Sequence, residues 1–380
     1  MAASAHYDVI IVGAGPAGLS TALHLLQLDP RWSERMLVLE KAVHPRFKLC
    51  GGAVTRLGLK ILQGLGLPLP LPIPYAYVRE VHLKYEHRIV VLHGKPQLLV
   101  FERAVLDEYL AREAQARGAK LCQGEPLREI EFTPDGVALQ TERASYSATV
   151  VVGADGSNGV IHRWARRKRA KARIARTLEG ICSASLDPEG LAEGVALFDF
   201  TWMRNGLQGY GWKFPFPGGG ETALSCGLYD ARLATHLPLS SLPRLFHAAF
   251  PLFKAPSEAW QGHPIHRFSP RNRFAFPHLV LVGDTAGVDP LFGEGIGPAL
   301  AYGQLAARAI HRAFERRDFS FVTYRSLLKR SYLGRYLMVR WFTAEVCYRM
   351  AGRSWFPPLV WQLGNWLARL FPQPKPLFSR

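Results

Sequence analysis

Residues 13–18 near the amino terminus, Gly-Ala-Gly-Pro-Ala-Gly, have the residue types and the spacing of a dinucleotide-binding loop. In this pattern the first glycine allows a tight turn, the second lets the backbone approach a pyrophosphate, and the third lets a helix pack closely on a strand. The pyrophosphate lies at the amino terminus of that helix, where free N–H groups and the helix dipole favour negative charge. We therefore expect cofactor contacts from four residues of the loop: Gly13, Gly15, Ala17 and Gly18.

The elements that must position this loop occur in the order that a dinucleotide-binding fold requires. Residues 7–12 are apolar and β-branched, which predicts a buried parallel strand, and residues 19–28 predict the helix after the loop. A second strand is predicted at residues 36–39 and ends in Glu40, 22 residues after Gly18. A carboxylate at this point accepts hydrogen bonds from a ribose and repels a 2′-phosphate. This order favours a dinucleotide site over a glycine-rich turn without a ligand.

Two further carboxylates are predicted at the ends of strands. Asp155 follows the apolar residues 148–152, and Asp284 follows the apolar residues 278–282. Ligands of open α/β sheets bind at the carboxyl ends of the strands. Two such acids beyond the glycine loop are more than NAD alone requires, which favours a larger dinucleotide.

The chain resembles the flavoproteins of the p-hydroxybenzoate hydroxylase superfamily. The glycine motif, Asp155-Gly156 and Gly283-Asp284 occur in the order of that superfamily, and the resemblance implies that Asp284 binds the ribityl and ribose portion of FAD. Residues 103–110 match its Arg-x-x-x-Asp-x-x-Leu pattern, which implies that Arg103 lies near the FAD. Without the other motifs, Arg103 and Asp107 would be interpreted as an ordinary i,i+4 helix pair.

Within the superfamily, three segments resemble the geranylgeranyl reductase family, flavoenzymes that reduce isoprenoid double bonds. They are residues 45–52 (PRFKLCGG), 210–215 (YGWKFP) and 289–296 (DPLFGEGI), and the resemblance covers roughly residues 5 to 310. It implies further cofactor contacts from a set of residues in or near these motifs: Lys41, Lys48, Cys50, Gly51, Gly156, Gly283, Pro290, Gly293, Gly295 and Ile296. Tyr229 replaces the second glycine of a Gly-x-Gly segment of the family, which changes the expected shape of the substrate pocket.

The candidate catalytic residues are Cys50, Tyr210 and Trp212. Cys50 follows a basic pair and precedes two glycines, so its thiol is expected to have a lowered pKa and to lie near flavin or substrate. The alternative is a small apolar residue in a packed turn. Tyr210, Trp212 and Phe214 share one face of a predicted strand, and the resemblance implies that they wall the substrate cavity. The alternative is an ordinary aromatic sheet core.

Residues 290–297 form a glycine-rich loop that opens a helix predicted at residues 298–311. Its backbone N–H groups and the helix dipole would stabilise the negative charge of a reduced flavin. Glu294 has two interpretations: it points into this site, or it complements the helix start. The histidines lack metal-ligand spacing, so no metal site is expected.

The chain has 380 residues, with 47 Lys and Arg against 30 Asp and Glu, which gives a net charge of +17. This length predicts two domains, and 48% apolar residues exclude a disordered or collagen-like chain. The net charge predicts an anionic partner. Five scattered cysteines without a CxxC pair disfavour a disulfide framework or zinc ribbon and favour a reducing, cytoplasmic location.

Two segments hold much of the positive charge. Residues 163–176 contain eight basic residues, and residues 327–380 contain nine basic residues, one acid and four tryptophans. Basic residues interleaved with aromatics are typical of helices in a membrane interface, so we expect the tail to lie on the inner face of a membrane without spanning it. The alternative is a helical cap whose aromatics pack on the rest of the protein.

The expected fold class is α/β. It comprises a Rossmann-like FAD-binding domain of the glutathione-reductase type, an α+β substrate domain with an antiparallel sheet that interrupts it, and a helical C-terminal tail. The expected ranges are 1–74, 99–176 and 268–320 for the FAD-binding domain, 75–98 and 177–266 for the substrate domain, and 321–380 for the tail.

The resemblance implies a FAD-dependent oxidoreductase that reduces carbon–carbon double bonds of an isoprenoid or prenyl lipid by hydride transfer from reduced flavin. The chain has one dinucleotide fingerprint, so NAD(P)H or a ferredoxin-like protein is expected to act as a transient electron donor. A FAD-dependent monooxygenase, hydroxylase- or halogenase-like, on a hydrophobic substrate is the alternative, although the Trp-x-Trp-x-Ile-Pro segment of halogenases is absent. A third hypothesis, a flavin-bound nucleic-acid-binding or scaffold protein, lacks a recognised nucleic-acid module, so no specific nucleic acid is expected.

Overall fold

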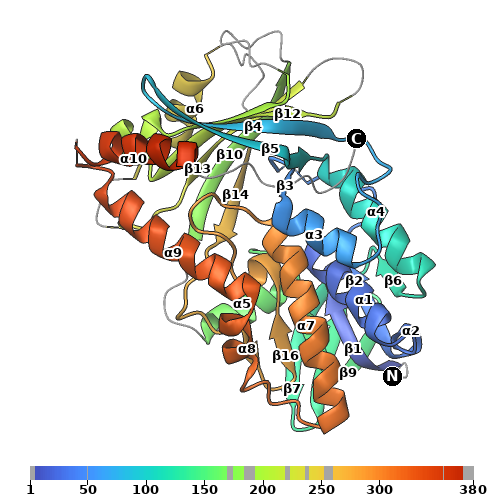
Figure 1. The fold of residues 1–380 in the computed structure, drawn as a ribbon. Helices are drawn as coiled ribbons and strands as arrows, with labels where there is room; N and C mark the ends of the chain where they lie inside the picture. Colours follow the sequence, from blue (N-terminus) through green and yellow to red (C-terminus); the bar gives the residue numbers. More distant parts are fainter. Residues whose placement is uncertain are drawn as a thin grey trace.

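A computed structural model gives the fold of the chain (Figure 1). It describes residues 5–48, 50–168, 174–183, 193–218, 223–235, 239–251, 260–353 and 355–370, apart from the side chains of Lys95 and residues 367–370. Part of each basic segment lies outside the described residues, namely 169–173 of the first and 371–380 of the second.

The first sheet has a parallel core and occupies the lower half of Figure 1. Its main path runs in the order β15-β16-β9-β1-β2-β6, and β8 and β7 continue from β9 as antiparallel strands. The strands are β1 (Ala5–Val12), β2 (Met36–Glu40), β6 (Lys120–Gln123), β7 (Leu127–Thr133), β8 (Gly136–Thr141), β9 (Ser145–Gly153), β15 (Ala275–Phe276) and β16 (Leu279–Leu281). The second half of β1 is buried throughout, as expected for a parallel strand whose two faces are both covered.

Helices cover the first sheet and pack closely on one another. They are α1 (Pro16–Leu28), α2 (Trp32–Arg35), α3 (Arg56–Gly64), α4 (Arg103–Ala116), α5 (Val160–Arg167) and α7 (Ile296–Arg316), with a 3-10 turn η4 (Gly283–Thr285) before α7. The Ser20 hydroxyl of α1 donates to the Leu300 carbonyl of α7 over 2.7 Å. A side chain at Gly303 would lie 2.6 Å from Ser20, so the contact between the two helices depends on that glycine.

The second sheet crosses the upper half of Figure 1 in the order β14-β10-β13-β12-β11-β4-β5-β3. Its strands are β3 (Ala53–Thr55), β4 (Ala76–Tyr85), β5 (Arg88–Val100), β10 (Ile174–Ser183), β11 (Val195–Asp199), β12 (Gly209–Phe216), β13 (Ala223–Asp230) and β14 (Gln261–His266). All neighbours are antiparallel except β11 and β4, and η2 (Thr201–Asn205) and α6 (Leu242–Ala249) lie beside it.

The expected fold class is confirmed: a Rossmann-like FAD-binding fold carries a mainly antiparallel second sheet and a helical C-terminal region. One strand differs from the expected division, because β3, from the first range assigned to the FAD-binding domain, pairs with β5 in the second sheet. The domain boundaries stay a prediction.

The C-terminal helices connect the two cores. Helix α9 (Tyr332–Met350) follows the short α8 (Tyr324–Arg330), crosses obliquely beside both sheets and leads to α10 (Phe356–Leu370), which packs on β5 and β4 (Figure 1). Leu333 and Leu337 of α9 join the core of the first sheet, whereas Ala344 and Tyr348 join that of the second. No helix within the described ranges is long and apolar enough to cross a membrane.

Trp361 fixes α10 to the second sheet. Its indole N–H donates to the Leu83 carbonyl over 2.7 Å, and its ring contacts those of Tyr85 and Phe200. Trp366 on the same helix is 58% exposed. Trp361 therefore packs α10 against the second sheet, whereas Trp366 lies on the surface of the same helix.

We predict that Trp361→Ala lowers the thermal unfolding midpoint and exposes α10 to proteolysis, since truncating a buried tryptophan costs about 3–5 kcal/mol. Trp366→Ala is the matched control and should leave both properties unchanged. Equal midpoints for the two variants in a thermal melt would contradict the packing of α10 described above.

Candidate functional site

A cavity of about 980 Å³ lies between the two sheets. Its walls include the glycine loop, the ends of β9 and β16, residues 40–42, 46–48 and 50–53, the loop 292–296 and the inner face of the second sheet. This volume is at the upper end of what small-molecule and cofactor sites occupy. The cavity therefore has room for a dinucleotide beside an apolar substrate.

The glycine loop is built as the sequence predicts. Gly13 has φ +109°, and a side chain there would overlap the Ala154 carbonyl. A side chain at Gly18 would overlap the carbonyl oxygen of Gly13. Gly15 differs, because among the described residues the only heavy atoms within 4 Å of a Cβ placed there are guanidinium nitrogens of Arg46 at 3.4 Å and Arg103 at 4.0 Å. Open space faced by two cations at a helix amino terminus fits a pyrophosphate.

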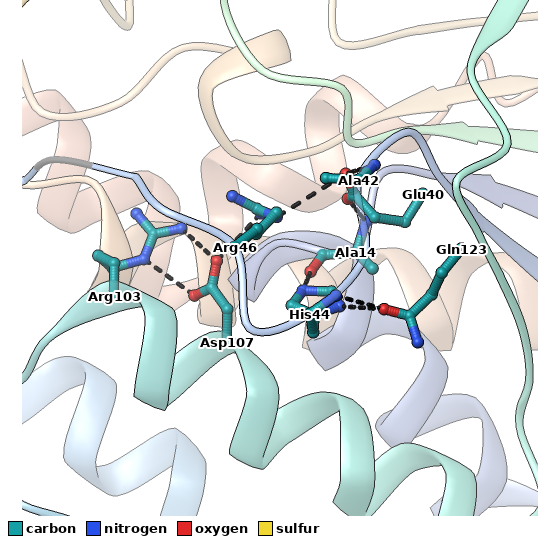
Figure 2. A network of polar contacts seen from close by, with 8 residues as sticks. All are labelled: Ala14, Glu40, Ala42, His44, Arg46, Arg103, Asp107 and Gln123. Atoms are coloured by element: carbon teal, nitrogen blue, oxygen red, sulfur yellow. Dashed lines mark hydrogen bonds and ion pairs between the residues drawn. The ribbon is translucent and has the colours of Figure 1, made fainter.

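A buried carboxylate holds these two arginines (Figure 2). Asp107 accepts two hydrogen bonds from Arg103, of 2.9 and 2.7 Å, and an Nη2 of Arg46 lies 3.0 Å from the same carboxylate. Asp107 is fully buried, and the arginines hold its pKa below the usual value against the effect of burial. The pair is thus more than a surface i,i+4 contact, and it places Arg103 beside the glycine loop.

Glu40 connects the end of β2 to the glycine loop. Its carboxylate accepts the amide N–H of Ala14 over 2.7 Å and that of Ala42 over 3.1 Å, with Arg46 3.7 Å away (Figure 2). The side chain borders the cavity, and its predicted contact with a ribose stays a prediction. Arg46 is a site residue that sequence reasoning missed, although it lies inside the PRFKLCGG motif.

Gln123 of β6 fixes the chain that follows β2. Its side-chain oxygen accepts the His44 amide N–H over 2.6 Å, and the His44 ring lies 3.2 Å from the Ala14 carbonyl oxygen (Figure 2). Residues 41–48 are therefore attached to both β6 and the glycine loop, which places Lys41 and Lys48 on the cavity wall.

The two predicted strand-end acids meet at one edge of the first sheet, because β9 and β16 are parallel neighbours. Asp155 accepts the Ile161 amide over 2.7 Å and the Thr285 hydroxyl over 3.2 Å, and burial raises its pKa to about 6. Asp284, after the end of the neighbouring strand β16, lies beside Gly295, and both acids line the cavity with Gly156 and Gly283.

The loop between η4 and α7 is fixed from both sides. The Asp289 carboxylate accepts the amide of Leu291 over 2.7 Å, and the hydroxyls of Tyr210 and Tyr229 donate to the carbonyls of Phe292 and Pro290. Of its predicted cofactor residues, Gly293, Gly295 and Ile296 line the cavity, whereas Pro290 is not among the lining residues.

Glu294 bonds to two other elements. It accepts the Thr55 hydroxyl over 2.6 Å and the hydroxyl of Tyr336 from α9, and its carboxylate borders the cavity. Burial raises its pKa, whereas the two hydrogen bonds act in the opposite direction. Arg340, one turn further along α9, lies 3.6 Å from Asp289. Tyr336 and Arg340 also line the cavity, and sequence reasoning missed both because no motif covers this region.

The aromatic wall is formed by β12 and β13. Tyr210, Trp212 and Phe214 all face the cavity, and the indole of Trp212 donates to the Ser225 hydroxyl over 3.2 Å. Tyr229 fills the space beneath the loop, since a side chain at Gly293 would lie 2.9 Å from its ring. The residue that departs from the Gly-x-Gly pattern therefore takes part of the pocket volume.

Cys50 lies on the cavity wall, but the expectation of a lowered thiol pKa is wrong. Burial raises the pKa of the thiol, and this effect outweighs the opposing influence of Arg103 and Lys48. Burial also favours the uncharged form of Lys48, which lowers the pKa of this amine. Glu179 and His263 on the same wall were not singled out from the sequence, and burial raises the pKa of Glu179 to about 7.

Comparison with known families and proteins agrees with this geometry. The FAD binding domain family matches residues 6–205. The chain is 26% identical to a digeranylgeranylglycerophospholipid reductase of Methanococcus vannielii over 334 residues, which are 83% of this chain and 79% of that protein. It is also 26% identical to a menaquinone reductase of Mycolicibacterium smegmatis over 324 residues, 79% of this chain and 75% of that protein.

Two solved structures show the same fold. A geranylgeranyl bacteriochlorophyll reductase-like protein of Thermoplasma acidophilum superposes with a TM-score of 0.72 at 21% identity, over 93% of each chain. The halogenase PltM superposes with a TM-score of 0.72 at 17% identity, over 96% of this chain and 82% of that one. The fold is thus shared by reductases and halogenases, and the cavity residues must distinguish them.

We predict that Gly15→Ala and Gly18→Ala both reduce FAD binding, but for different reasons. Alanine fits sterically at Gly15 but occupies the space between the arginines and the loop, so FAD affinity should fall about tenfold or more while the apoprotein keeps its thermal stability. Alanine at Gly18 overlaps the backbone of Gly13 and should destabilise the apoprotein itself. Flavin absorbance per protein and apoprotein melting curves measure the two effects; full FAD occupancy in Gly15→Ala would refute the assignment.

Proposed function

The chain belongs to the FAD binding domain family, and from this premise we propose that it is a FAD-dependent reductase of carbon–carbon double bonds in an isoprenoid or prenyl lipid. The observation that carries the proposal is an apolar, aromatic wall within the same cavity as the cofactor-binding loops. The reductase relatives are named for a digeranylgeranyl phospholipid and for menaquinone.

The predicted cofactor residues have distinct tasks in this proposal. Gly15, Arg46 and Arg103 would hold the pyrophosphate, and Glu40, Asp155 and Asp284 would face the ribose and ribityl hydroxyls. The loop 293–296 and the start of α7 would place backbone N–H groups against the isoalloxazine. When bound, FAD supplies the two-electron chemistry of the reaction.

The substrate side of the cavity is suited to a hydrocarbon chain. Its rings come from Phe198, Tyr210, Trp212, Phe214 and Phe292, and aliphatic side chains of β4 and β5 continue the wall. These side chains exclude water from the double bond and orient it, and Tyr210 and Trp212 would lie against the substrate. Cys50 stays a protonated thiol at neutral pH, because burial raises its pKa, and would contact flavin or substrate as an uncharged group.

We propose NAD(P)H or a ferredoxin-like protein as the electron donor, binding transiently. The single glycine fingerprint, at residues 13–18, is assigned to FAD, so a nicotinamide would have to approach the cavity from solvent.

Anaerobic turnover tests the proposed reaction. We predict that the chemically reduced holoenzyme, mixed without oxygen with a digeranylgeranylglycerophospholipid in detergent micelles, regains the absorbance of oxidised flavin while the lipid gains two hydrogens per double bond. Stopped-flow absorbance and mass spectrometry measure the two events. Reoxidation that requires oxygen and inserts it into the substrate would instead identify a monooxygenase.

We further propose that the outer face of α9 and α10 contacts an anionic membrane surface. The exposed large apolar and aromatic side chains on or next to these helices are Tyr332, Val339, Phe342, Val346, Trp355, Leu359, Leu363 and Trp366. The basic residues Arg335, Arg349 and Arg353 lie among them in the sequence. The cap alternative accounts for Trp361 and Tyr348, which are buried, but not for the exposed set. Apolar area combined with basic charge is what an interfacial helix presents to lipid.

We predict that the protein floats with vesicles of phosphatidylglycerol and phosphatidylcholine, and that the double variant Trp355→Ala/Trp366→Ala lowers the bound fraction at least about tenfold, because each buried aromatic contributes roughly 1.5–3 kcal/mol. Leu28→Ala, which removes an exposed apolar side chain from α1, is the matched control. Flotation that is the same for all three proteins would exclude this surface.

A further inference from the structure

We propose that Glu179 is the proton donor that completes saturation of the double bond. The inference rests on the proposed reductase function and assigns a catalytic role to a residue outside the family motifs. It is carried by the position of Glu179 on the cavity wall, in one row of the sheet with Trp212, and by the absence of a partner for its carboxyl among the described residues.

The sheet places Glu179 on the same face as the aromatic wall, two strands away from Trp212. Glu179 of β10 pairs in register with Gly227 of β13, which pairs with Trp212 of β12, so the three residues form one row on one face. A side chain at Gly227 would overlap the far edge of the Trp212 indole, so the indole lies across Gly227 toward β10. Glu179 and Trp212 therefore border the same part of the cavity.

Glu179 is 4% exposed, and no hydrogen bond or ion pair reaches its carboxyl from the described part of the chain. Of the other carboxylates that line the cavity, Glu40 accepts two backbone amides, Asp155 an amide and a hydroxyl, and Glu294 two hydroxyls. Asp284 lies after the end of β16, where the proposal assigns it to the ribose and ribityl hydroxyls. A carboxyl that is buried without partners is stabilised in its neutral form, which is the form that donates a proton.

The charged and titratable groups around Glu179 come from three elements. Lys48, from the segment after β2, and Arg103 of α4 act to lower its pKa, but burial dominates and raises it to about 7. Cys50 lies close enough for Glu179 to raise the thiol pKa further. His263 of β14 also lines the cavity, and burial lowers its pKa, so it is neutral when Glu179 titrates.

The other possible donors at this wall are less suitable. The hydroxyls of Tyr210 and Tyr229 already donate to backbone carbonyls, and burial raises the pKa of both far above neutrality. Burial also makes the Cys50 thiol a weaker acid. A general acid is most effective when its pKa lies near the working pH, which of these groups only Glu179 satisfies.

With Glu179 as the proton donor, the atoms and electrons of the double-bond reduction balance. Saturation of one C=C bond adds two hydrogens: one with the electron pair that FAD supplies when bound, and one as a proton. The O–H bond of Glu179 breaks as the second C–H bond forms and the π bond is lost, and a bound, reduced FAD would supply the two electrons. Water then reprotonates the Glu179 carboxylate. An isolated alkene has no carbonyl to take up developing charge, so the proton must be delivered at the carbon.

The first measurement does not depend on turnover. Infrared difference spectra of the oxidised holoenzyme should show a protonated carboxyl C=O band that disappears as pH rises through about 7 and is absent in Glu179→Gln. The Asp155 carboxyl, whose pKa burial raises to about 6, is common to both proteins and cancels when their spectra are subtracted. Glu131→Gln, the same change on the exposed surface of β7, should retain the band. A spectrum of Glu179→Gln that retains the band would overturn the protonated state on which the proposal depends.

The second measurement is anaerobic reoxidation of the chemically reduced holoenzyme by the digeranylgeranylglycerophospholipid in micelles. The wild-type rate should be highest below pH 7 and fall as pH rises, because the acid form is the donor. Glu179→Gln should slow reoxidation about 100-fold or more and remove this pH dependence, while FAD content and reduction by dithionite stay unchanged. Glu131→Gln should behave as wild type, and Glu179→Asp should recover part of the rate.

The outcomes separate the two proposals. A Glu179→Gln rate within about threefold of wild type, on a wild-type enzyme that the lipid does reoxidise, overturns the donor role and leaves the reductase function standing. Loss of FAD from Glu179→Gln assigns the residue to cofactor binding and also overturns the donor role. A wild-type enzyme that the lipid does not reoxidise overturns the proposed function together with the inference that rests on it.

Discussion

The carboxylate of Asp107 lies fully buried between the guanidinium groups of Arg103 and Arg46, whose nitrogens face Gly15. Two buried cations so close together would be unfavourable without that carboxylate, and removing one partner of such a cluster typically costs about 3–5 kcal/mol. With it, the three charges sum to one net positive charge that faces the glycine loop. Because Arg46 also approaches Glu40, the cluster links α4, β2 and the loop into one rigid cofactor-binding surface.

The opposite side of the cavity depends on hydrogen bonds to the backbone of the loop 289–296. Tyrosines from three elements, Tyr210 of β12, Tyr229 of β13 and Tyr348 of α9, donate to the carbonyls of Phe292, Pro290 and Leu291. Since these hydroxyls come from the second sheet and the C-terminal helix, the loop cannot move without disturbing both. The segment that approaches the predicted flavin position is thereby fixed by the substrate side of the molecule.

The cofactor side was predictable from sequence because its signals are local. A turn such as Gly13–Gly18 and an acid at a strand end such as Asp155 are encoded within a few residues, and β-sheet topology brings them together. Glu179, Tyr336 and Arg340 carry no local signal, because the residues that they meet at the cavity, Trp212, Glu294 and Asp289, are more than 30 positions away in the sequence. The thiol pKa of Cys50 was mispredicted for the same reason: the neighbouring cations are visible in the sequence, whereas the desolvation that outweighs them is a property of the folded cavity.

Helix α9 lies between the proposed membrane-binding surface and the cavity. Tyr336 and Arg340 line the cavity, whereas Val339 and Phe342, adjacent to them in the sequence, are 65% and 64% exposed. With 3.6 residues per turn, one helix therefore presents cavity-lining groups on one face and apolar groups to solvent on another. If that outer face lies on a membrane, as proposed, only the width of helix α9 would separate the bilayer from the cavity that takes up the prenyl chain. The excess of positive charge in the tail would then serve the same function as the aromatic cavity, since it would hold α9 and the cavity behind it against anionic lipid.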